Sequence, residues 1–171
     1  MARIVFVTGF IETGRDTIID MVLKGSSKKL VGLKHVRFED MGVSGLKSAI
    51  PGNIRKSRDQ FYSKVERAAS DAMKSGMSVV VEGPLTAKTE NGYLPIVPRD
   101  FFDSFAPEII ILFEMPDGKD VDSLHQQINR AYAGTYASLA GCPLKIITVK
   151  KNGVKYALRD CTVVMENVLG R

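Results

Sequence analysis

The sequence predicts an α/β protein, a three-layer α/β/α sandwich built on a five-stranded parallel sheet. Short apolar runs alternate along the chain with segments of helical periodicity. The runs are apolar throughout, as in strands that are covered on both faces. The chain has 171 residues, of which 44% are hydrophobic and 25% charged. That balance is typical of one globular domain, so we expect residues 1–171 to form a single domain.

Five segments have the composition of buried strands. The clearest are residues 77–81, which are nearly all apolar, and residues 108–114, which contain the run Ile-Ile-Ile-Leu-Phe. Residues 4–8 form a short run with β-branched residues, and residues 34–38 form the weakest of the five candidates. The predicted strands cover residues 4–8, 34–38, 77–81, 108–114 and 144–149.

Helices are predicted between these strands. The most regular is residues 57–75, where Ser57 can cap the N-terminus and Gly76 can end the helix. Two connections, residues 41–54 and 83–97, are predicted as a turn-rich stretch and a loop. The predicted helices cover residues 17–24, 57–75, 98–105, 122–139 and 154–169.

The net charge of +5 is unevenly distributed along the chain. Residues 24–67 hold eleven basic and four acidic residues, and residues 144–159 hold five basic residues and no acid. Residues 100–122 instead hold seven acids and one lysine. Two interpretations stay open: ordinary solvated surface, or a positive rim around a site for phosphates. The basic region 24–67 is also a candidate surface for RNA or a ribosomal component.

Composition argues against several classes of protein. Cys142 and Cys161 cannot form a disulfide framework and fit a reducing cytosol. There is no Cys-x-x-Cys motif and the only histidines are His35 and His125, so we expect no structural metal. No apolar run approaches the roughly 20 residues of a membrane span, and the start lacks the features of a signal peptide. We therefore expect a cytoplasmic protein without a membrane partner.

The segment after the first predicted strand has the spacing of a phosphate-binding loop. Gly9 and Gly14 are separated by four residues and lie between a strand and a helix. In such loops, backbone N–H groups and a helix N-terminus converge on an anion. Arg15 stands where the motif has lysine, and Asp16 where it has a hydroxyl residue.

These departures affect the charge of the loop. Arg15 keeps the positive charge, but its guanidinium is bulkier than an ammonium group and forked. Glu12 and Asp16 add two carboxylates, and like charges about 4 Å apart repel by about 1 kcal/mol even in water. Asp16 also lies in the first turn of the predicted helix, where a carboxylate is favoured by the dipole. Retained phosphate binding and a helix N-terminus capped by acids both remain open.

Residues 86–94 read Thr-Ala-Lys-Thr-Glu-Asn-Gly-Tyr-Leu and follow the strand segment Val-Val-Val-Glu. This stretch resembles one in the archaeal type of adenylate kinase, a family of P-loop nucleoside monophosphate kinases. Weaker matches extend the resemblance over most of the chain. They lie at residues 58–60, 107–114, 125–126, 129–130 and 144–147.

The resemblance implies phosphoryl transfer from ATP to AMP, with ATP and magnesium as cofactors and nucleotides as the bound partners. This chemistry depends mainly on positioning and positive charge. The residues implied at the donor phosphates and magnesium are Gly9, Gly14, Arg15, Asp16, Thr17 and Glu82. Asp16 and Glu82 are those implied to help place the metal. Those implied at the acceptor nucleotide are Arg58, Thr86, Lys88, Thr89, Tyr93 and Leu94. The implied catalytic cations are Arg15 and Arg130. Alternative interpretations stay open, with Lys88 and Arg58 as plain surface residues and Glu82 as a structural hydrogen-bonding residue.

The resemblance also divides the domain into parts. Residues 38–75 correspond to a helical monophosphate-binding subregion, and residues 115–124 to a vestigial lid with three aspartates and no arginine. A lid excludes water and adds cations around the reacting group. We therefore expect weak or altered kinase activity. The alternatives are a catalytically inactive pseudo-kinase that binds RNA or protein, and a kinase for another nucleoside monophosphate. Archaeal relatives also suggest a homo-oligomer.

Overall fold

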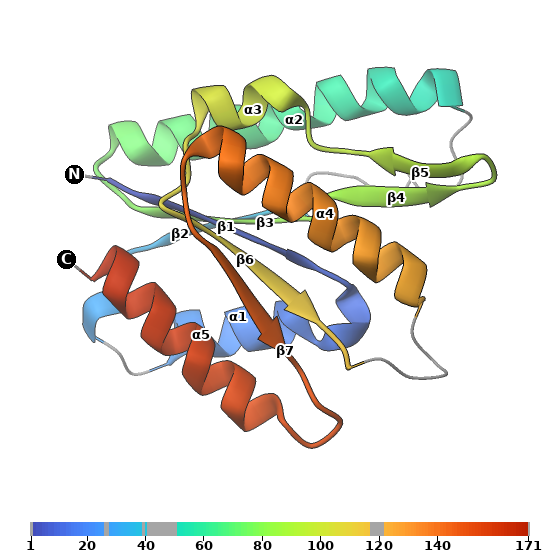
Figure 1. Ribbon diagram of the computed structural model, residues 1–171. Helices are drawn as coiled ribbons and strands as arrows, with labels where there is room; N and C mark the ends of the chain where they lie inside the picture. Colours follow the sequence, from blue (N-terminus) through green and yellow to red (C-terminus); the bar gives the residue numbers. More distant parts are fainter. Residues whose placement is uncertain (1, 26–27, 39, 41–50, 117–121, 171) are drawn as a thin grey trace.

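A five-stranded parallel sheet forms the centre of the protein (Figure 1). The computed structural model describes all residues except 1, 26–27, 39, 41–50, 117–121 and 171. The strand order is β2-β3-β1-β6-β7, and every neighbouring pair is parallel, as predicted. The strands are β1 (Ile4–Gly9), β2 (Lys34–Arg37), β3 (Val79–Glu82), β6 (Ile109–Glu114) and β7 (Leu144–Thr148).

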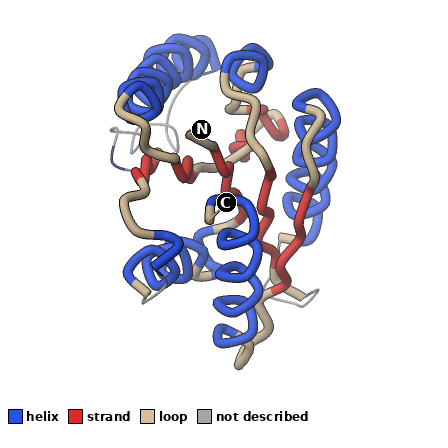
Figure 2. Tube along the Cα trace, turned by 90° about the vertical axis from the view of Figure 1, so that its left-hand side faces the viewer, coloured by secondary structure: helices blue, strands red, loops and turns tan. Residues whose placement is uncertain are grey.

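Helices cover both faces of the sheet, which confirms the predicted three-layer sandwich (Figures 1 and 2). One layer contains α1 (Arg15–Lys24) and α5 (Val154–Leu169), and the other contains α2 (Pro51–Lys74), α3 (Arg99–Ser104) and α4 (Ser123–Ala140). Two short 3₁₀ turns, η1 (Ile11–Thr13) and η2 (Lys28–Leu30), flank α1. No helix in the described ranges combines the length and apolar character needed to cross a membrane.

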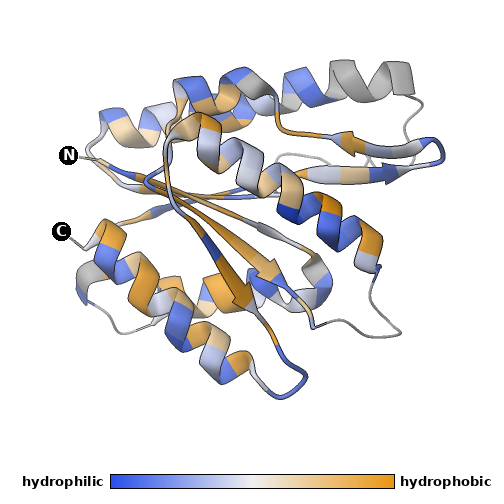
Figure 3. Ribbon diagram, viewed as in Figure 1, coloured by the Kyte–Doolittle hydropathy of each residue, from blue (hydrophilic) through white to orange (hydrophobic). Residues whose placement is uncertain are grey.

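The central strands are apolar on both faces because each face supports its own core. Successive side chains of a strand point to opposite faces. Phe6 therefore packs with the core beneath α2, α3 and α4, whereas Val5 and Val7 pack with the core beneath α1 and α5. Hydropathy colouring shows the central strands as mainly hydrophobic (Figure 3).

Two predictions about connections were wrong. Helix α2 begins at Pro51 rather than at Ser57. Residues 51–54 of the predicted turn-rich stretch are therefore helical. Proline is accommodated there because the first helical N–H groups have no partner within the helix. The predicted loop 83–97 contains an antiparallel hairpin, β4 (Thr86–Thr89) and β5 (Gly92–Pro95). Its strands have only four residues each, β4 is largely polar and β5 contains Gly92 and Pro95, so their composition was not that of a buried strand.

Two predicted parts of the domain extend beyond the described residues. The predicted lid, residues 115–124, includes residues 117–121, and the predicted monophosphate-binding subregion, residues 38–75, includes residues 41–50. Both divisions therefore remain predictions.

Candidate functional site

The loop between β1 and α1 contains two glycines with positive φ. Gly9 has φ +128°, and a Cβ atom there would lie 2.2 Å from the carbonyl oxygen of Phe113. Gly14 has φ +70° and directly precedes the first residue of α1, Arg15. The loop therefore presents a helix N-terminus at the carboxyl edge of the sheet, where ligands of open α/β folds bind.

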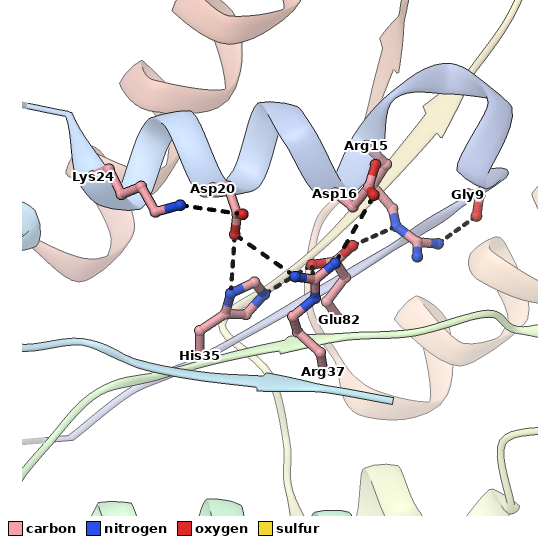
Figure 4. A network of polar contacts seen from close by, with 8 residues as sticks. All are labelled: Gly9, Arg15, Asp16, Asp20, Lys24, His35, Arg37 and Glu82. Carbon is pink, nitrogen blue, oxygen red and sulfur yellow. Dashed lines mark hydrogen bonds and ion pairs between the residues drawn. The ribbon is translucent and has the colours of Figure 1, made fainter. Parts of the chain in front are cut away.

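The side chain of Arg15 points into the protein (Figure 4). Its Nε donates a hydrogen bond of 2.9 Å to Oε1 of Glu82, and its Nη1 donates one of 2.5 Å to the carbonyl oxygen of Gly9. The arginine is only 1% exposed. The guanidinium thus lies beneath the loop, against the end of β3, with these two oxygen atoms as partners.

Glu82 is the acceptor at the centre of this arrangement. Its Oε1 accepts from Arg15, and its Oε2 lies 2.8 Å from Nε2 of His35. Burial acts to raise the pKa of Glu82, but the hydrogen bond to His35 and the charge and hydrogen bond of Arg15 lower it overall. Glu82 is therefore an anion that balances the positive charge of Arg15.

The rest of this network joins β2 to α1 (Figure 4). His35 and Arg37 are two residues apart on β2, so they share a face, and Asp16 and Asp20 are four residues apart on α1. Nδ1 of His35 lies 3.8 Å from Oδ1 of Asp20. The guanidinium of Arg37 lies within 3.9–4.0 Å of Asp16, Asp20 and Glu82. Sequence reasoning missed His35, Arg37 and Asp20, although these spacings were a usable signal.

A second buried acid holds Arg130. Nε of Arg130 donates a hydrogen bond of 2.8 Å to Oε1 of Glu114, and Nη2 donates to Oε2. Glu114 ends β6 and is 2% exposed, whereas the side chain of Arg130 is 56% exposed. The backbone N–H of the next residue, Met115, donates to Oε1 of Gln126, and Nε2 of Gln126 donates to the carbonyl oxygen of Met115, which fixes this strand end to α4. The forked pair is thus held by rigid elements on both sides.

The hairpin residues implied at the acceptor lie against the start of α4. The hydroxyl of Thr86 donates to Oδ1 of Asn129 at 2.5 Å and lies 2.8 Å from Nε2 of His125. Nζ of Lys88 lies 2.5 Å from Oδ2 of Asp122, the N-cap residue of α4. These contacts hold the hairpin against α4.

Aromatic rings connect this hairpin to the loop. The ring of His125 lies 4.8 Å from the ring of Phe10 in the loop and 4.8 Å from that of Tyr93 in β5. Burial lowers the pKa of His125, an effect that the nearby Lys88 reinforces and Asp122 opposes. The imidazole is therefore favoured in its neutral form near pH 7.

The remaining predicted residues are more peripheral. The hydroxyl of Thr89 donates to the carbonyl oxygen of Gly92 within the hairpin turn, and Leu94 is paired with Ala87. Thr17 is exposed on α1, and Nε of Arg58 on α2 donates to Asp59 at 2.9 Å. None of these contacts favours a binding role over a structural one.

The cations that the resemblance implied share one property: each has a carboxylate partner within 4.0 Å. The pairs are Arg15–Glu82, Arg130–Glu114, Lys88–Asp122 and Arg58–Asp59. A phosphate that enters the site must therefore compete with these carboxylates for the positive charges.

The residues implied to place magnesium do not fit that ion as they are arranged here. Mg²⁺ requires oxygen ligands at 2.0–2.1 Å in an octahedron, usually from one or two carboxylates, waters and substrate phosphates. Both oxygens of Glu82 already face nitrogen donors, and Arg37 lies between Glu82 and Asp16. Among the described residues, no group of three or more His, Cys, Asp or Glu is arranged to hold a metal ion.

Comparison with known proteins confirms the predicted resemblance. No protein-family model matches the chain. It is 26% identical to an adenylate kinase from Methanothermobacter thermautotrophicus, covering 96% of this chain and 100% of the relative. It is 29% identical to one from Thermoplasma acidophilum, covering 90% and 93%. The chain is thus a homologue of archaeal adenylate kinases over most of its length.

A solved structure supports the fold class. The fold resembles the crystal structure of a sugar kinase from Janibacter sp. HTCC2649, with a TM-score of 0.55 and 11% sequence identity. The likeness covers 99% of this chain and 97% of that one. At this identity the comparison bears on the fold alone.

Proposed function

We propose that this protein binds nucleotides at the carboxyl edge of its sheet and transfers a phosphoryl group slowly from ATP to AMP. The observation that carries this proposal is the strand–loop–helix geometry at Gly9 and Gly14, which opens a helix N-terminus toward the sheet edge. Homologues called adenylate kinase, which match most of the chain, support the choice of nucleotides.

On the donor side, we assign the phosphates to the backbone of this loop and the first turn of α1. Gly9 and Gly14 allow the backbone to approach the anion, and the helix N-terminus contributes N–H groups that are not used by hydrogen bonds within the helix. Arg15 contributes through the loop, because its hydrogen bond to the carbonyl oxygen of Gly9 fixes the loop backbone. On the acceptor side, we assign the nucleotide to the edge formed by Thr86, Lys88 and Tyr93.

The slow rate follows from the charge pairing. Phosphoryl transfer is accelerated mainly by cations that stabilise charge on the transferring group. Arg15 and Arg130 are the arginines implied in that role, and each is held by a buried glutamate. Breaking a fully buried pair such as Arg15–Glu82 costs about 3–5 kcal/mol, and breaking the partly exposed Arg130–Glu114 pair costs less. If contact with phosphate does not offset that cost, the rate falls by a factor of about 10²–10⁴.

A coupled assay for ADP tests this proposal. We expect ADP to form from ATP plus AMP at high enzyme concentration, and a thermal shift with ATP and with AMP. A panel of other nucleoside monophosphates in the same assay separates an adenylate kinase from a kinase for another acceptor. Absence of both turnover and thermal shift would overturn the proposal.

The charge pairing also favours a second candidate, a catalytically silent nucleotide-binding protein. Its prediction differs in one respect: ATP stabilises the fold, but no ADP forms at any enzyme concentration. RNA binding through residues 24–67 and assembly into a homo-oligomer remain predictions from the sequence. Region 24–67 includes stretches outside the described residues.

A further inference from the structure

Arg37 lies where α1 and the end of β3 approach each other (Figure 4). It is the last residue of β2, and its side chain is 26% exposed. Nη2 lies 3.9 Å from Oδ2 of Asp16, and Nε lies 4.0 Å from Oε2 of Glu82. Nη1 lies 4.0 Å from Oδ1 of Asp20. One guanidinium therefore faces three carboxylates from two different elements.

Asp16 and Glu82 are the two residues that the resemblance implied for magnesium. Asp16 follows the loop cation in the first turn of α1, and Glu82 ends the strand next to β1. The delocalised charge of a guanidinium lies in a planar fork that can face two carboxylates at once. Arg37 thus lies between the two acids that would otherwise share a divalent cation.

The contacts of Arg37 are those of a counter-ion. Its Nε is buried and has no hydrogen-bond partner among the described residues, and its three ion-pair distances are all near 4 Å. Glu82, in contrast, has hydrogen bonds of 2.9 Å and 2.8 Å with Arg15 and His35. Electrostatic attraction at about 4 Å holds the guanidinium among the acids.

We propose that Arg37 replaces magnesium as the cation between Asp16 and Glu82, so that nucleotide binding does not require the metal. Arg37 is then a positioning residue, since its positive charge lies within 4.0 Å of the two acids that border the loop. The consequence for nucleotides rests on the proposed function. The replacement of the metal itself is a property of the free protein and is tested separately.

The first experiment measures Mn²⁺ binding to the protein without nucleotide, by loss of the free Mn²⁺ signal in electron paramagnetic resonance. We expect Arg37→Gln to bind Mn²⁺ at least about tenfold more tightly than the wild type, because it removes a positive charge that lies within 4.0 Å of Asp16, Asp20 and Glu82. Adding Asp16→Asn to that variant should abolish the gain. Arg159→Gln, which removes an exposed arginine paired with Asp160 on α5, is the matched control and should not change binding.

The second experiment measures ATP binding by calorimetry in excess magnesium and in EDTA. The wild type should bind equally in both, within about threefold. Arg37→Gln should bind at least about tenfold more weakly in EDTA and recover in magnesium, whereas Arg37→Lys should stay close to the wild type in both. Thermal melting of each variant shows whether it folds.

Three results overturn the inference: no gain of Mn²⁺ affinity in Arg37→Gln, a gain that survives Asp16→Asn, or wild-type ATP binding that needs magnesium. If the wild type binds no nucleotide in either medium, the proposed function fails, and the Mn²⁺ titration still decides the role of Arg37. If Arg37→Gln does not fold, Arg37→Met and Arg37→Lys replace it, with the lysine variant expected to gain no Mn²⁺ affinity.

Discussion

Nε of Arg15 donates a hydrogen bond of 2.9 Å to Oε1 of Glu82, and these side chains are 1% and 0% exposed. Arg15, the cation of the loop, is thus paired in the protein interior with Glu82 at the end of β3, the strand next to β1. In this arrangement Arg15 ties the loop to β3, through its hydrogen bonds to Glu82 and to the carbonyl oxygen of Gly9.

Breaking this pair should destabilise the protein. Arg15→Met or Glu82→Gln alone should lower the free energy of unfolding by about 3–5 kcal/mol, because each leaves a buried charge without its partner. The double variant should be more stable than the sum of the single effects implies. Urea denaturation measures all three, and single effects below about 1 kcal/mol would show that the pair is not buried in solution.

Glu82 should also contribute to the acid sensitivity of the fold. Its pKa in the folded protein lies below the ordinary value of 4.5, because hydrogen bonds and charge from His35 and Arg15 outweigh burial. Its contribution is therefore fully present above that ordinary value and is lost as pH falls through the lowered pKa.

A comparison of melting temperature against pH checks this expectation. Glu82→Gln should lose less stability than the wild type between about pH 5 and the acid limit of folding, because its amide does not titrate. Parallel profiles that differ by a constant amount at every pH would show that folding does not lower the pKa of Glu82.

Releasing Arg130 should raise activity. Glu114→Gln removes the carboxylate that holds this arginine, so we expect phosphoryl transfer to increase by about tenfold, a fraction of what one electrostatic contact supplies. Asp160→Asn, which frees Arg159 on α5, is the matched control and should not change the rate. A lower rate in a folded Glu114→Gln protein would argue against inhibition by charge pairing.

The two glycines of the loop should differ in their tolerance of alanine. At Gly9 a Cβ atom would lie 2.2 Å from the carbonyl oxygen of Phe113, in addition to the strained φ of +128°. At Gly14, with φ +70°, no atom lies within 4 Å of the added Cβ.

Gly14→Ala should therefore cost about 1–2 kcal/mol, the strain of a left-handed residue, and Gly9→Ala clearly more. Chemical denaturation of both variants tests the order. Equal costs would mean that the strand end moves to admit the side chain.

Local patterns were sufficient to predict most of the fold. The buried strand around Ile110 and the α4 segment from its N-cap Asp122 to Gly141 were visible as runs and periodicity, because both depend on nearby residues. The hairpin at Thr86 was missed because its strands bury little apolar surface and lie outside the main sheet.

The position of the loop between β1 and α1 was predicted, but the contacts of its side chains were not. Gly9 and Gly14 marked the loop through their spacing, and Glu82 was placed at the adjacent strand end. The direction of Arg15 was not predictable, because its partner lies 67 residues away along the chain.

The sequence alone determined the alternation of the main-sheet strands with helices, the position of the loop and the acids near it in the chain. Only the tertiary structure decided which acid neutralises which cation. The reason is physical: periodicity and turn chemistry act over a few residues, whereas an ion pair depends on distances between separate elements. Parallel packing brings the ends of β2 and β3 beneath α1, so that His35, Arg37 and Glu82 join Asp16 and Arg15 in one network.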